Sequence, residues 1–119
     1  MKILVCGGRN YLNYEYLALT LDDIIRQTHY PYECTILQGG AKGTDFLAKV
    51  YANQWDCEMK EYPANWKKYG KGAGPIRNQQ MLDEGKPDLV VAFPGGVGTA
   101  DMIRRSKKAG IEVIEVGKS

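Results

Sequence analysis

The stretch DLVVAFPGGVGTAD, residues 88–101, carries the clearest structural signal in this sequence. Asp88 to Phe93 is a short, almost continuous apolar run, which is typical of a strand buried on both faces of a sheet. The run ends in Pro94-Gly95-Gly96, and a helix is expected from Thr99 to Ala109, stopped by Gly110. A buried strand, a glycine turn and a helix in this order predict one βα unit of an α/β fold.

The rest of the chain alternates in the same way. The other predicted strands are Ile3–Cys6, Cys34–Leu37, Glu58–Tyr62 and Ile111–Val116, and the other predicted helices are Tyr14–Thr28 with Asn13 as N-cap, Thr44–Gln54 and Ile76–Glu84. Glu58–Tyr62 is only partly apolar, which indicates an edge strand, and Ala64–Pro75 has no period and is expected to be a loop. Five strands and four helices predict a Rossmann-like three-layer sandwich, an α/β fold with a mostly parallel sheet and helices on both faces.

Length and composition narrow the class of protein. A chain of 119 residues predicts one domain, residues 1–119, and 44% hydrophobic with 25% charged residues excludes disorder of the whole chain. The formal charge of +2 is too small to indicate nucleic-acid binding. A single histidine, His29, excludes a His-based metal cluster, and three cysteines without CxxC spacing favour reduced thiols. Without a targeting or membrane segment, we expect a soluble cytoplasmic protein with no membrane contact.

Glycine pairs follow three of the predicted strands: Gly7-Gly8, Gly39-Gly40 and Gly95-Gly96. The carboxyl ends of parallel strands lie at one edge of a sheet, where ligands of such folds bind. Glycine lets the backbone approach a ligand closely, and a following helix N-terminus favours phosphate. The pattern therefore predicts a phosphate or nucleotide site, the alternative being tight turns alone. Neither a P-loop nor a clean GxGxxG is present.

Several polar and aromatic residues accompany these glycines. Arg77 is the strongest single candidate, since Pro75 stiffens the chain before it. The Ala64–Pro75 segment could form a flap over the ligand, in which Trp66 or Tyr69 stacks on a base. Thr99 can cap its helix or bind phosphate. Each of these residues also has an interpretation without a ligand. The flap could be a solvated loop and Arg9 a surface residue, and Asp45 and Asp101 could be carboxylates that the helix dipole favours in a first turn. The candidate ligand-binding residues are Gly7, Gly8, Arg9, Gly39, Gly40, Gly43, Asp45, Trp66, Arg77, Asn78, Pro94, Gly95, Gly96, Gly98 and Thr99.

A basic cluster ends the Thr99–Ala109 helix. Its members are Arg104, Arg105, Lys107 and Lys108. Positive charge at a helix C-terminus is favoured by the helix dipole. We interpret the cluster as a solvated face rather than a nucleic-acid patch.

Four segments resemble a known superfamily. CGGRNY (6–11), QGGAKGTD (38–45), AGPIRNQQM (73–81) and AFPGGVGTADM (92–102) are similar to the SLOG superfamily, named after Smf/DprA and Lonely Guy proteins. The small YspA-like branch of that superfamily fits over almost the entire chain. The resemblance implies a Rossmann-like fold that binds nucleotides or nucleotide-derived ligands at the glycine-rich loops on the carboxyl edge of the sheet. It also implies a homo-oligomer, since Lonely Guy proteins are dimers, whereas DprA-like members bind DNA.

One departure from the resemblance concerns catalysis. Lonely Guy enzymes hydrolyse the N-glycosidic bond of a nucleotide with the Glu of PGGxGTxxE and an Arg that Arg77 resembles. That Glu position is Met102 here, and Asp101 is rotated from it by about 100° on a helix. We therefore expect a sensor or carrier module that binds a nucleotide, without metal or cofactor. The alternative is a phosphoribohydrolase with Arg77, Asp101 and Asp45 as catalytic candidates; DNA binding is disfavoured by the small net charge.

Overall fold

Five strands form one sheet in the computed structural model, which describes residues 1–27 and 33–117. The strands are β1 (Lys2–Cys6), β2 (Thr35–Gln38), β3 (Glu58–Glu61), β4 (Leu89–Ala92) and β5 (Glu112–Glu115). Their order is β3-β2-β1-β4-β5, and each neighbouring pair is parallel. The Rossmann-like prediction is confirmed, with a sheet that is wholly parallel in the described residues and β3 at an edge.

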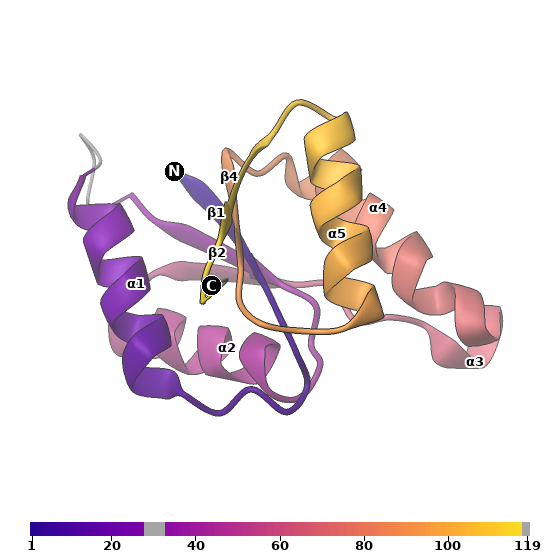
Figure 1. The fold of residues 1–119 in the computed structure, drawn as a ribbon, viewed down its shortest axis with the longest axis horizontal. Coiled ribbons are helices and arrows are strands. Elements are labelled where there is room, and N and C mark those ends of the chain that lie inside the picture. The colour runs from indigo at the N-terminus through magenta and orange to yellow at the C-terminus, as the bar shows by residue number, and fades with distance from the viewer. Residues whose placement is uncertain (28–32, 118–119) are drawn as a thin grey trace.

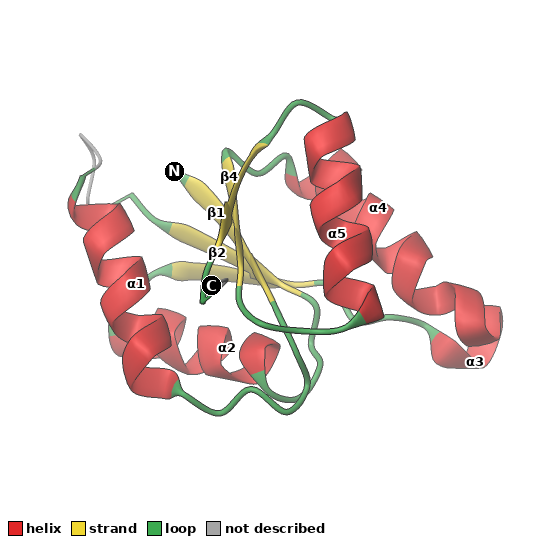
Figure 2. Ribbon diagram, viewed as in Figure 1, coloured by secondary structure: helices red, strands yellow, loops and turns green. Residues whose placement is uncertain are grey.

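Helices cover both faces of this sheet (Figures 1 and 2). α1 (Tyr14–Arg26) and α2 (Thr44–Gln54) pack on one face, and α4 (Ala73–Gly85) and α5 (Val97–Lys108) pack on the other. A short helix, α3 (Trp66–Tyr69), and a 3₁₀ turn, Gly70–Gly72, precede α4. The result is the three-layer arrangement that the sequence predicts.

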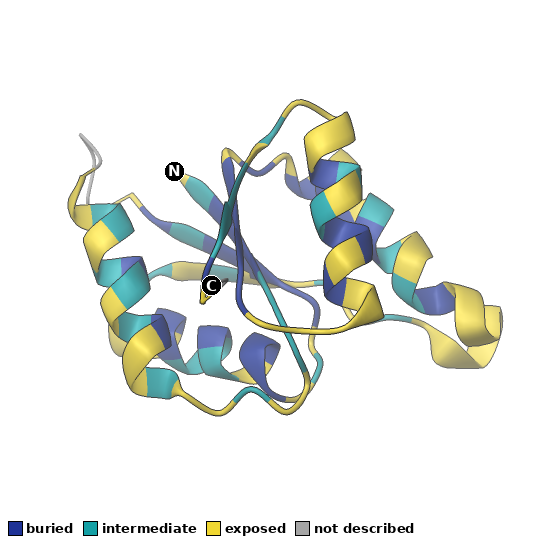
Figure 3. Cartoon of the chain, in the orientation of Figure 1, coloured by how far each residue is buried: buried dark blue, intermediate teal, exposed yellow. Residues whose placement is uncertain are grey.

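Buried residues lie along the inner strands and on the helices of both faces (Figure 3). Alternation along β1 divides this core into two layers. Ile3 and Val5 face α1 and α2, where they meet Leu17, Leu21 and other residues of one buried cluster. Leu4 faces the opposite side and joins the second cluster. That second cluster contains Leu4, Leu37, Met81, Leu82, Val90 and Met102. Successive side chains of a strand point to opposite faces, so a continuous apolar run supplies both layers at once.

The start of α1 is as predicted. The Oδ1 atom of Asn13 accepts a hydrogen bond of 3.1 Å from the Tyr16 amide, which satisfies one of the unpaired N–H groups of the first turn. The helix ends at Arg26. Thr28, its predicted last residue, and His29 lie outside the described residues.

The prediction of a loop over Ala64–Pro75 is wrong. Most of this segment is helical, and α4 begins at Ala73 rather than Ile76. Asn65 starts α3 by accepting a 3.0 Å hydrogen bond from the Lys68 amide, and buried Ala73 anchors the first turn of α4. A four-residue helix is too short to show a helical period, which explains the error.

The beginning of α5 also differs from the prediction. The helix begins at Val97, two residues before Thr99, with Gly96 as its N-cap. Thr99 is buried within the first turn and does not cap the helix. Gly110, at φ +77°, follows the helix as the predicted stop.

The backbone of Gly8 joins all three glycine loops. Its amide donates to the Pro94 carbonyl at 2.9 Å, and its carbonyl accepts from the Thr44 amide at 3.1 Å and the Thr44 hydroxyl at 3.0 Å. Gly43, at φ +71°, lies directly against the carbonyl oxygens of Gly8 and Arg9, where a Cβ atom would overlap them. The loops after β1, β2 and β4 are therefore held together by main-chain contacts.

We predict that Gly43→Ala destabilises the fold much more than Gly110→Ala. Both glycines have positive φ, which costs alanine about 1–2 kcal/mol, but only Gly43 also has backbone atoms against the position of Cβ. Overpacking adds about 1–3 kcal/mol at Gly43. Urea denaturation of the two variants measures the difference in free energy of unfolding, and equal losses would contradict the tight junction.

Candidate functional site

A cavity of about 680 Å³ opens at the carboxyl ends of β1 and β4. The sheet order reverses between these two strands, which is the place where open parallel sheets bind ligands. Val5, Cys6, Met81 and Met102 give it apolar walls. Burial raises the pKa of the Cys6 thiol to about 12, so the thiol is protonated at neutral pH and adds no charge.

Most of the predicted ligand-binding residues line this cavity. They are Gly7, Gly8, Arg9, Gly39, Asp45, Trp66, Arg77, Asn78, Gly96, Gly98 and Thr99. The structure brings them together from the loops after β1, β2 and β4 and from helices α2 to α5. Their role toward a ligand stays a prediction.

Four predicted residues lie in the same loops but outside the lining of this cavity: Gly40, Gly43, Pro94 and Gly95. Gly40 has φ +74° and donates to the Gln38 side chain at 2.5 Å. A Cβ atom on Gly95 would overlap the Thr99 hydroxyl. Backbone conformation at Gly40 and close packing at Gly95 account for the absence of a side chain.

Arg77 connects α4 to the loop after β2. Its Nη1 donates to the carbonyl of Gly39 at 2.6 Å and more weakly to that of Tyr62 at 3.4 Å, and its Nε donates to Asn78 Oδ1 at 3.2 Å. Nε and Nη1 of the guanidinium therefore already have hydrogen-bond acceptors within the protein. Burial lowers the pKa of Arg77, and the charge of Asp45 opposes this effect.

Asp45 is a buried carboxylate at the start of α2. Its Oδ2 accepts a hydrogen bond of 3.2 Å from the Ala41 amide. Burial raises the pKa of Asp45, although the Ala41 hydrogen bond and the nearby Arg77 charge lower it in part. The cavity thus has a carboxyl group whose proton affinity is higher than usual.

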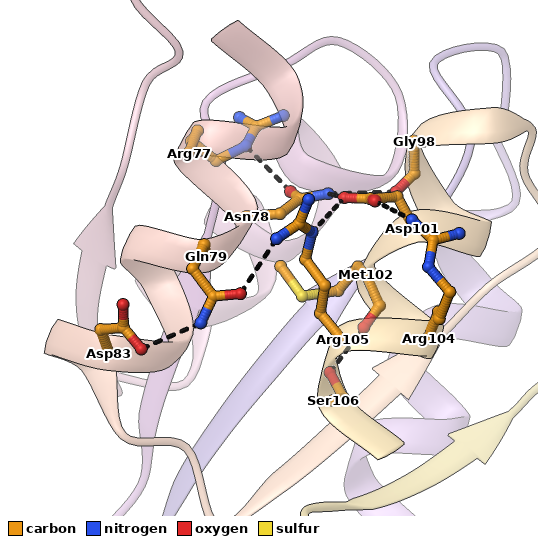
Figure 4. A network of polar contacts seen from close by, with 10 residues as sticks. All are labelled: Arg77, Asn78, Gln79, Asp83, Gly98, Asp101, Met102, Arg104, Arg105 and Ser106. Carbon is orange, nitrogen blue, oxygen red and sulfur yellow. Dashed lines mark hydrogen bonds and ion pairs between the residues drawn. The ribbon is translucent and has the colours of Figure 1, made fainter. Parts of the chain in front are cut away.

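Asp101 is the centre of a polar network between α4 and α5 (Figure 4). Its Oδ2 accepts from Asn78 Nδ2 at 3.0 Å and from Arg105 Nε at 2.8 Å, and its Oδ1 pairs with Arg104. Asn78 also donates to the Gly98 carbonyl at 3.2 Å. Burial alone raises the pKa of Asp101, but these hydrogen bonds and the two guanidinium charges outweigh it, so the pKa lies below its usual value.

An aromatic residue stands beside the cavity. The Arg9 guanidinium lies over the Trp66 ring, 5.4 Å from the ring centroid, and both residues line the cavity. This cation–π contact joins the loop after β1 to α3. Tyr69, the other predicted stacking residue, is not part of the lining and has Lys68 Nζ 5.1 Å from its ring centroid.

Two cationic lining residues, Lys71 and Arg104, stand outside the candidate ligand-binding set, although Lys71 belongs to the segment in which a flap is predicted. The interpretation of Arg104 as part of a solvated helix end is incomplete, because its side chain is exposed but borders the cavity. Val97, Asp101 and Arg104 follow one another at helical spacing and all line the cavity. That spacing, counted from the glycine turn, could have identified Arg104 from the sequence.

Within residues 1–27 and 33–117, no group of three or more His, Cys, Asp or Glu side chains could hold a metal ion. In the same described part of the chain, no helix is long and apolar enough to cross a membrane.

Comparison with known proteins identifies the family. The sequence profile of the YspA, cpYpsA-related SLOG family matches residues 1–69. The Gene 61 protein of Mycobacterium phage D29 is 33% identical over 125 residues, covering 98% of this chain and 96% of the phage protein. The chain belongs to the YspA-related SLOG family.

A solved structure supports the fold of this SLOG protein. DNA processing protein A (DprA) from Streptococcus pneumoniae matches with a TM-score of 0.73 at 19% identity. The match covers 99% of this chain, which spans about half the length of the DprA chain. At this low identity the likeness concerns the fold alone. The family profile includes the first two glycine loops, whereas Arg77 and the loop after β4 follow its last matched residue.

We predict that Asp101→Asn lowers the free energy of unfolding at pH 7 by about 1.5–3 kcal/mol, the value of hydrogen bonds to a charged group. The folded-state pKa of Asp101 lies below its ordinary value of 3.8, so its stabilising contribution is present above that value. The contribution disappears as the pH falls through the folded-state pKa, and the two proteins should then converge.

Urea denaturation between pH 7 and pH 2 tests this expectation. Asp83→Asn is the matched control, because Asp83 is exposed and only accepts a 3.0 Å hydrogen bond from Gln79. Its effect should stay within about 0.5 kcal/mol, as for most surface substitutions. A stability gap between wild type and Asp101→Asn that does not change with pH would contradict the charge-based role.

Proposed function

We propose that this SLOG protein binds a nucleotide or nucleotide-derived ligand in the cavity and acts as a sensor or carrier without turnover. The observation that carries the proposal is the cavity at the point where the sheet order reverses, with the cationic side chains of Arg9, Lys71, Arg77 and Arg104 in its lining. Cations and a helix N-terminus together favour an anionic ligand such as a phosphate.

The remaining lining suits the other parts of a nucleotide. Trp66 is half exposed beside the cavity and can stack on a base, while Met81 and Met102 offer apolar contact. Asp45 can accept a hydrogen bond from a ribose hydroxyl. A volume of about 680 Å³ lies within the usual range of small-molecule sites. SLOG membership also suggests a nucleotide-related role.

The carboxylates favour binding over hydrolysis. Met102 occupies the Glu position of the Lonely Guy motif and is buried, and Asp101 already accepts from Asn78, Arg104 and Arg105. Cleavage of a glycosidic bond needs a carboxyl group that can protonate the leaving group or face the developing positive charge. Asp45 is the remaining carboxyl group in the lining, so turnover by it is the outcome that would replace our proposal.

The test is native mass spectrometry of the purified protein with a panel of nucleotides and cyclic nucleotides, followed by calorimetry of any that bind. We expect an intact ligand at stoichiometric occupancy. The same spectrum gives the mass of the assembly and so tests the expected homodimer. A retained ribose phosphate with release of free base would establish hydrolysis instead, and a panel without any binding would reject the proposal.

We predict that Gly96→Val abolishes this binding without unfolding the protein. A Cβ atom on Gly96 meets no atom within 4 Å, so a side chain has room there, yet it would stand at the cavity edge. Ala109→Val is the control, since it places the same side chain at the other end of α5. A folded Gly96→Val variant with wild-type affinity would place the ligand elsewhere.

A further inference from the structure

Arg104 and Arg105 share one carboxylate but are held very differently (Figure 4). The Arg105 side chain is 30% exposed, and besides Asp101 it donates to Gln79 Oε1 at 3.0 Å. Gln79 in turn donates to Asp83, so Arg105 belongs to a chain of contacts along α4. The Arg104 side chain is 69% exposed and pairs with the other oxygen of Asp101.

Asp101 can lose Arg104 without becoming an unpaired buried charge. Its Oδ2 would keep the hydrogen bonds from Asn78 and Arg105, and the Arg105 guanidinium would still balance its charge. Leaving a buried carboxylate without a partner is strongly unfavourable, but that does not arise here. The Arg104 contact is therefore the replaceable one, because the Arg104 end of this ion pair is largely exposed to solvent.

The cavity gives Arg104 an alternative partner. Arg104 lines the cavity, whereas Arg105 does not. Among the other lining cations, Arg77 is committed to Gly39 and lies in the field of Asp45, Arg9 is over Trp66, and Lys71 is an exposed ammonium without the paired donors of a guanidinium. A negatively charged ligand group thus meets in Arg104 a guanidinium on a long, largely exposed side chain, whose contact with Asp101 can be exchanged without leaving that carboxylate unpaired.

We propose that Arg104 selects ligands by charge: it pairs with Asp101 in the empty protein and transfers to an anionic group of the ligand, while Asn78 and Arg105 keep Asp101 paired. This role of Arg104 rests on the proposed function, in which the cavity is the ligand site. Asp101 then acts as an internal competitor for Arg104, so removing its charge should strengthen anion binding.

Inorganic phosphate is the probe, because it presents the anion without a base or sugar. Calorimetry should show phosphate affinity reduced about tenfold or more in Arg104→Gln, the loss of one charge-assisted hydrogen bond or more. Lys108→Gln is the matched control, with the same change of charge on the same helix, and should stay within about twofold. Arg104→Lys, which keeps the charge, should recover part of the affinity.

Asp101→Asn distinguishes the proposed competition from a merely structural role. We expect it to bind phosphate severalfold more tightly than wild type, because Arg104 is released. Equal losses in Arg104→Gln and Lys108→Gln, weaker binding by folded Asp101→Asn, or no phosphate binding by wild type up to tens of millimolar would each overturn the proposal.

The nucleotide panel separates this proposal from the function on which it rests. If nucleotides bind wild type and Arg104→Gln equally well, the role of Arg104 is wrong while the proposed function stands. If phosphate binds through Arg104 but no nucleotide binds, the proposed function fails and the anion site remains.

Discussion

The main-chain hydrogen bonds of Gly8 hold the candidate site together. Gly8 follows the central strand β1, and its amide and carbonyl reach the loops after β4 and β2 at 2.9–3.1 Å. Buried backbone groups must be paired, so these bonds fix three loops relative to one another at the distance of a peptide contact. Side chains would interfere at that distance, which explains the glycines at positions 43 and 95.

Only part of the role of these glycines could be predicted from the sequence. Short apolar runs followed by glycine pairs correctly predicted parallel strands that present their loops at one edge, because that signal is local. Glycine can border a cavity or let two loops touch, and in both cases the reason is that it lacks a Cβ atom. Gly96 and Gly43 therefore looked alike in the sequence, although only Gly96 lines the cavity.

Tertiary contacts account for what the sequence did not reveal. The first turn of α4 depends on buried Ala73, and Arg77 is oriented by carbonyls distant in sequence, at Gly39 and Tyr62. Arg104 resembled a solvated residue because its neighbours on α5 are also basic. Likewise, the carboxylate stands at Asp101, whereas the Glu position of the Lonely Guy motif is Met102. Asp101 lies between α4 and α5 and joins the two helices.

The central position of β1 has a consequence for how the chain folds during synthesis. β1 pairs with β2 on one side, but on the other it pairs with β4, and the Lys2 amide donates to Asp88, 86 residues later. Until β4 leaves the ribosome, one edge of the central strand stays exposed to other chains, and α5 is not yet present to help cover the face on which α4 packs. Long-range parallel pairing of this kind is slow. Nascent chains that end before Leu89 should therefore depend on chaperones, because β4 and β5 do not yet exist.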